Sequence, residues 1–220
     1  MTELALLKMV HLLCLIYWLG ADLGVFYSSF FVADEERGPE ARIVAAKILF
    51  TLDLGPRICM PLILATGVHL AKMMAMLKFH DAVVPVTWAV CLVWLGLVLT
   101  VHFSSGEQRR ALLTRIDFNL RVLVIAALLG FSLYVLFYAT STLRDWLVYK
   151  TIVLALMIFC GLMIRVKLRP FGPAFRHFAA GDHGQPHSHT VSHALTSTRP
   201  YVIVIWIGLF LNTAWSVKLL

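Results

Sequence analysis

Ionisable side chains lie within the long apolar stretches of this chain, and they are the first candidates for chemistry. An ionisable group at membrane depth costs about 2.5–3.5 kcal/mol on insertion scales, so each one that is retained needs a structural or functional reason. The ionisable residues in these stretches are His11, Asp22, Asp53, Arg57, His69, Arg121 and Lys150.

Two of these residues, His11 and His69, are candidate metal ligands. At 1.5 Å per residue, His11 lies about 10 Å and His69 about 9 Å inside the same end of two successive, antiparallel apolar stretches. Neutral imidazole is the commonest metal ligand, and a pair on facing helices can hold a haem iron from both sides. Copper accepts the same ligands. The alternative is that each histidine only hydrogen-bonds a neighbouring helix.

The spacing of polar residues in the first stretch predicts a single stripe facing the interior of a helical bundle. His11, Trp18, Asp22 and Ser29 are separated by seven, four and seven residues, which suits 3.6 residues per turn. Trp18 is therefore a candidate cofactor contact beside His11. Asp22 should lie at the depth of an Asp53–Arg57 ion pair, and a structural ion-pair network is the favoured interpretation of these three residues.

Lys150 enters its apolar stretch about one and a half turns from the end, near the depth of His11 and His69. It can bind a carboxylate or a propionate there. The competing interpretation is a lysine whose ammonium group simply reaches back to the membrane interface.

Two further clusters are compatible with metal binding. Soft thioethers suit Cu(I), and histidines bind several transition metals, but methionines also serve as apolar filler and a histidine-rich segment can be a solvated linker. The clusters are Met73, Met74, Met76 and His80, and His183, His187, His189 and His193.

The elements that carry these residues are predicted to be transmembrane helices. The 220 residues are 60% hydrophobic and 14% charged, with a mean hydropathy of +0.83, and spans need about 20 apolar residues each. We expect an all-α integral membrane protein, one polytopic domain over residues 1–220, built as a bundle of about six spans in contact with the lipid bilayer. The expected spans are 4–31, 44–75, 82–103, 118–141, 145–168 and 199–219.

The second span is predicted to be long and kinked, because it contains Pro56 and Pro61. The stretch 169–198, rich in Pro, Gly, Ser and His, is predicted to be a hydrophilic loop. The four cysteines, each alone in a different apolar stretch, suggest neither a disulfide framework nor a zinc site. No cleavable signal sequence is expected at the start of the first span.

Lysines and arginines are distributed unequally between the two ends of the predicted bundle. The end with both termini carries Lys8, Lys72, Lys78, Arg144 and Lys218, against eleven at the other end: Arg37, Arg42, Lys47, Arg109, Arg110, Arg115, Arg165, Lys167, Arg169, Arg176 and Arg199. The basic end, with the 169–198 segment, should be cytoplasmic and both termini outside the cytoplasm. This placement accounts for the net charge of +7 without nucleic-acid binding.

Short motifs resemble a known family. Leu6-Leu-Lys-Met-Val-His11 followed by Tyr17-Trp18-Leu-Gly20 resembles the first helix of the bacterial membrane protoporphyrinogen IX oxidases and of the related copper-resistance D proteins. The segment from Asp145 through Lys150 resembles the W-L-x-x-K-L helix of those oxidases, and the helix from Pro200 to Lys218 resembles their last span. The oxidases have four spans, so the segment 82–141 would add two, and the shared motifs cover under half of the chain.

The resemblance implies haem b, with His11 and Lys150 as the functional residues that carry over. It also implies a bacterial inner membrane. We therefore expect a haem-binding redox protein with His11 and His69 as ligands and Lys150 as the candidate catalytic residue. Electrons would pass from a small reduced substrate or a partner redox subunit to quinone. The alternatives are a copper-handling transport protein and a scaffold subunit without a cofactor, and a homo-oligomer is compatible with each.

Overall fold

The computed structural model describes residues 3–76, 80–104, 106–138, 144–181 and 185–216, with the side chains of Arg144 and Gln185 excluded. These ranges form helices and short connections, without a strand among them. The helices are α1 (Glu3–Ala33), α2 (Pro39–Leu52), α3 (Leu54–Met73), α4 (Val83–Phe103), α5 (Glu107–Tyr138), α6 (Arg144–Lys167), α7 (Phe171–Ala179), α8 (Gln185–Thr196) and α9 (Arg199–Ser216).

The all-α membrane architecture is confirmed. Within the described ranges, six helical segments are long and apolar enough to cross a membrane: α1, α2 with α3, α4, α5, α6, and α8 with α9. Large apolar side chains such as Tyr17, Val93 and Phe137 remain exposed on their outer faces, as expected where lipid is the solvent. The protein is a multi-pass membrane protein.

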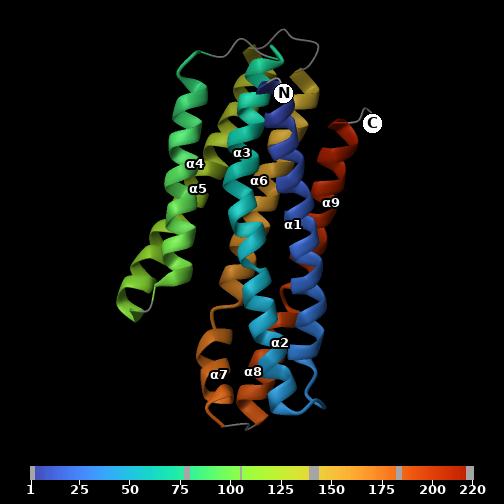
Figure 1. The fold of residues 1–220 in the computed structure, drawn as a ribbon, viewed down its shortest axis with the longest axis vertical. Coiled ribbons are helices and arrows are strands. Elements are labelled where there is room, and N and C mark those ends of the chain that lie inside the picture. Colours follow the sequence, from blue (N-terminus) through green and yellow to red (C-terminus); the bar gives the residue numbers. More distant parts are fainter. Residues whose placement is uncertain (1–2, 77–79, 105, 139–143, 182–184, 217–220) are drawn as a thin grey trace.

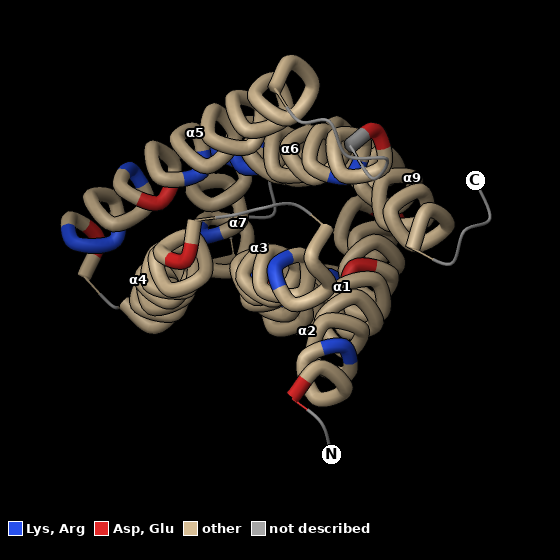
Figure 2. The backbone as a smooth tube through the Cα atoms, turned by 90° about the horizontal axis from the view of Figure 1, so that it is seen from above, with Lys and Arg blue, Asp and Glu red and all other residues tan. Residues whose placement is uncertain are grey.

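The spans pack as two layers. Seen from above in Figure 2, α4, α3 and α1 form one layer, and α5, α6 and α9 form the other. Between the layers lies a core of apolar residues that includes Trp18, Met60, Trp94 and Ile158. The start of α1 and the end of α9 lie at one end of the bundle, which we call end A, and α7 and α8 lie at the opposite end, end B (Figure 1).

The second span is interrupted, as its prolines predicted. α2 ends at Leu52, Asp53 forms a turn, and α3 begins at Leu54. Pro56 has no N–H to donate to the carbonyl of Leu52, and its ring crowds that carbonyl. Pro61, in contrast, lies inside α3 without ending it.

The α1 helix packs closely against this interruption. A Cβ atom added at Gly24 would lie 2.5 Å from Leu52 Cδ1, and one added at Gly55 would lie 2.9 Å from Ala21 Cβ. Asp22 on α1 and Asp53 are therefore brought to the same level of the bundle.

The prediction that 169–198 is a loop is wrong. The segment forms α7 and α8, and their apolar residues pack with Val32 on α1 and with Ala45, Ala46 and Leu49 on α2. The loop was predicted from the prolines, glycines and histidines of this segment, although apolar residues also recur in it at helical spacing. These residues are Phe171, Ala174 and Phe178 on α7, and Val191, Ala194 and Leu195 on α8. This second core extends the bundle at end B.

Arg42 holds this second core together. Its side chain is buried, with the residue only 2% exposed. The guanidinium donates to the Val32 carbonyl at 2.9 Å, to Ser188 Oγ at 2.7 Å and to Ser192 Oγ at 3.4 Å. It also lies 4.5 Å from the centre of the Phe178 ring. One arginine on α2 thus binds α1, α7 and α8.

Candidate functional site

His11 is held by a hydrogen bond across the α1–α3 interface. Its Nδ1 lies 2.7 Å from Oγ1 of the buried Thr66, and that hydroxyl lies 2.7 Å from the Leu62 carbonyl. Because the Thr66 hydroxyl proton goes to the carbonyl, His11 Nδ1–H is the donor to Thr66. In the neutral ring, Nε2 then carries the lone pair.

His69 has a different partner. Trp88 Nε1 on α4 lies 3.4 Å from His69 Nδ1, and the two rings meet edge to face with centroids 6.5 Å apart. An indole N–H can only donate, so His69 Nδ1 is the acceptor. The two histidines predicted to bind one iron are thus each hydrogen-bonded to another residue. Shared ligation of an iron remains a prediction.

A small pocket of about 230 Å³ lies beside His69 near end A. His69 and the His11 partner Thr66 line it, together with Trp88 and Glu3. The other lining residues are Leu6, Leu7 and Val10. The space is mostly apolar and opens near the start of α1.

Lys150 reaches the same region from the second layer. Its ammonium group donates a hydrogen bond to Ser216 Oγ on α9 and lies 4.6 Å from the centre of the Trp146 ring. The charge of Lys150 is close enough to act electrostatically on the His11 imidazole. His11 and Lys150 therefore lie on different layers, within electrostatic range of each other, in the half of the bundle nearer end A.

Trp18 is 1% exposed in the interior, and its indole N–H donates to Asp22 at 3.1 Å. The predicted interior stripe of α1 is therefore present, but the polar edge of Trp18 is already used within α1. Asp53 and Arg57 form the predicted ion pair one helical turn apart.

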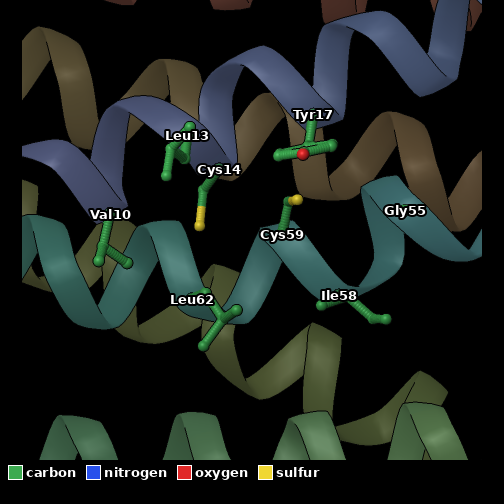
Figure 3. Close-up of a pocket in the computed structure, with 8 residues that line it drawn as sticks. All are labelled: Val10, Leu13, Cys14, Tyr17, Gly55, Ile58, Cys59 and Leu62. Atoms are coloured by element: carbon green, nitrogen blue, oxygen red, sulfur yellow. The ribbon is translucent and has the colours of Figure 1, made fainter.

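An apolar groove of about 310 Å³ lies between α1 and α3, and its lining includes Val10, the residue before His11 in the sequence (Figure 3). Cys14 and Cys59 face this interface from opposite helices. The remaining lining residues are Leu13, Tyr17, Gly55, Ile58 and Leu62. All four cysteines of the chain are free thiols.

The most deeply buried charged cluster was predicted only in part, because the sequence pointed to Arg121 but not to its partners. Asp117 on α5 accepts hydrogen bonds from Trp94 Nε1 at 3.1 Å, from Arg121 Nε at 3.0 Å and from Arg165 Nη1. Arg121 Nη1 also contacts the Met60 sulfur at 3.1 Å. α5 begins at Glu107, eleven residues before the predicted span at 118, so Asp117 was placed outside the membrane. The i, i+4 spacing of Asp117 and Arg121 was the available signal.

The two clusters predicted to be compatible with metal binding are only partly assembled. Met73 and Met74 are exposed at the end of α3. Nearby, Lys72 donates to Asp81 at 2.9 Å, and this bond and the lysine charge lower the pKa of the exposed Asp81 carboxyl. His183 lies outside the described residues, whereas His187, His189 and His193 lie on α8. Across the described ranges, no three His, Cys, Asp or Glu side chains form a group that could hold a metal.

A further histidine, His102, lies at the end of α4 toward end B, with its ring centroid 4.9 Å from that of Phe103. It is far along the helix from the level of His69 and Trp88.

Comparison with known proteins adds no relative: no family model, no curated protein and no solved structure matches this chain.

Proposed function

We propose that this protein binds haem b in the membrane and transfers electrons, and that His11 would hold the haem iron. The observation that carries the proposal is the His11 imidazole, fixed by Thr66 on one helical layer, with the Lys150 ammonium on the other layer within electrostatic range. Iron-ligating histidines characteristically donate their second ring N–H to a neighbouring acceptor. Thr66 is such an acceptor for His11.

The surroundings of His11 suit a ligand role. Thr66 fixes the tautomer in which Nε2 can bind a metal. Gly67, one residue further on α3, leaves room for the ring, because an added Cβ would lie 3.3 Å from His11 Cε1. A haem in this position would supply one-electron chemistry whose potential depends on the residues that hold the iron and on burial.

His69 is the proposed second ligand. Its hydrogen bond from Trp88 is long at 3.4 Å, so it is weak and can be given up. Trp18 would contribute an apolar wall, because its indole N–H is taken by Asp22.

Lys150 would bind an acidic group, either a haem propionate or a carboxylate of the substrate. Its ammonium group contacts Trp146 and Ser216, which lie at one side of the proposed site. The substrate would be a small reduced molecule or a partner redox subunit, and quinone in the bilayer would accept the electrons. The setting we propose is the bacterial inner membrane, with end B in the cytoplasm.

An absorbance spectrum of the detergent-purified protein tests this function. After expression with ample haem, the oxidised and dithionite-reduced protein should show Soret and α bands. His11→Ala should lose the haem and His69→Ala should lose or alter it, whereas His102→Ala should keep the wild-type spectrum. Thr66→Val should retain haem with shifted bands, because only the orientation of His11 is disturbed.

Two results would overturn the proposal. The first is a wild-type protein without a Soret band although haem is abundant in the same cells. The second is an unchanged spectrum in both His11→Ala and His69→Ala, which would show that any haem is held elsewhere.

A further inference from the structure

The α8 helix carries a pair of histidines that the proposed function does not use. His189 and His193 are four residues apart, and both are exposed. Their rings are nearly parallel, with an interplanar angle of 19° and centroids 6.1 Å apart. They lie at end B, the opposite end of the bundle from the start of α1 (Figure 1), so this pair is independent of His11.

The helix beneath the pair is firmly held. Ser188, Val191, Ala194 and Leu195 are buried on the opposite face of α8, and Arg42 donates to Ser188. The backbone that presents the two imidazoles is therefore fixed, while the exposed rings can still change rotamer. This combination lets two nitrogen atoms converge without moving the helix.

We propose that His189 and His193 form a binding site for a divalent late transition-metal ion of the Zn²⁺, Ni²⁺ and Cu²⁺ class. Residues four apart lie on one face of a helix, and two histidines at this spacing hold zinc in helical metal sites. Zinc–nitrogen bonds are about 2.0–2.1 Å, so the two nitrogen atoms must approach to roughly 3 Å. The approach requires a rotation of the two exposed rings, whose centroids lie 6.1 Å apart.

The number of ligands determines what the site can do. No third His, Cys, Asp or Glu joins the pair in the described part of the chain, so water would complete the coordination of the ion. A site with two protein ligands exchanges its ion, in contrast to a closed four-ligand structural site. Reversible capture of metal at end B is therefore the expected role.

A second pair of histidines lies between the short helices α7 and α8. The rings of His177 on α7 and His187 on α8 are stacked, with centroids 5.0 Å apart and an interplanar angle of 13°. An ion between them would bridge α7 and α8. This pair must be tested separately, because an ion bound there would add to the total metal that the protein takes up.

The experiment is a Zn²⁺ titration by calorimetry of the full-length, detergent-purified protein without a polyhistidine tag. Cu²⁺ electron paramagnetic resonance on the same samples reports nitrogen ligation. The informative variant is His193→Ala combined with Thr196→His. It keeps the number of exposed histidines on α8 but separates them by seven residues, about 10.5 Å along the axis.

The wild type should bind Zn²⁺, and the double variant should lose one equivalent together with the corresponding two-nitrogen Cu²⁺ signal. His177→Ala should keep the equivalent that belongs to His189 and His193. The proposal fails if the wild type takes up no Zn²⁺. It also fails if the double variant binds with wild-type stoichiometry and affinity while its helical circular dichroism is unchanged.

Discussion

At the scale of single residues, this bundle distinguishes polar groups that hold it together from polar groups that can react. Asp117 is fully buried and accepts from Trp94 on α4, Arg121 on its own helix and Arg165 on α6. All three partners are donors and together they bond both carboxylate oxygens, so Asp117 serves as a structural anion. His11 differs, because its Nε2 remains available once Nδ1 has bonded Thr66.

Asp117→Asn should therefore be strongly destabilising. The change leaves the buried guanidinium of Arg121 without its compensating charge, and breaking a buried ion pair in this way costs about 3–5 kcal/mol. Thermal or denaturant unfolding of the protein in detergent would measure the loss.

Asp34→Asn is the matched control. Asp34 is paired with Arg37, but both side chains are well exposed, so its removal should cost at most about 1 kcal/mol. Equal stability of the two variants would show that the Asp117 cluster does not hold the layers together.

At the scale of elements, the two short helices α7 and α8 depend on the helices against which they pack. α7 and α8 have 9 and 12 residues, lengths at which a helix is marginal alone, so their stability comes from packing on α1 and α2. Arg42 contributes the polar part of that packing through Ser188, Ser192 and the Phe178 ring.

Arg42→Met should loosen α7 and α8 without unfolding the spans. Methionine keeps an apolar stem in the second core but loses the charged hydrogen bonds, worth about 1.5–3 kcal/mol. Amide exchange in peptides from 171–196 should then be about tenfold to a hundredfold faster, as measured by mass spectrometry. Arg37→Met, at an exposed pair, should leave that exchange unchanged, and equal exchange in both variants would contradict the role given to Arg42.

At the scale of the whole molecule, the two ends of the bundle differ in charge and in structure. End A contains the start of α1, the end of α9 and the half of the bundle with His11 and Lys150, whereas end B contains the second core and most lysines and arginines. The positive charge at end B favours its retention in the cytoplasm.

A reporter joined to the C-terminus tests this orientation. Alkaline phosphatase, which is active only outside the cytoplasm, should be active there, and green fluorescent protein should be dark. The reverse pattern would place end A in the cytoplasm. Fusion to a truncated chain that ends at Ser104, after three spans, should give the opposite result to the full-length fusion.

The six spans, the break at Asp53 and the Asp53–Arg57 pair were determined by the sequence itself. They depend on hydropathy over about 20 residues, on one proline and on a spacing of four residues, which are local properties. The α7 and α8 helices were not predictable in this way, because their apolar faces gain stability only against α1 and α2.

The partners of the buried polar residues were decided by the tertiary structure. His11 and Thr66 are 55 residues apart, Asp117 and Arg165 are 48 apart, and Arg42 and Ser188 are 146 apart. Depth in the membrane follows from counting residues along a helix. Which neighbour a side chain meets depends on the rotation of each helix about its axis and on the arrangement of the two layers, and side-chain packing across the whole bundle sets both.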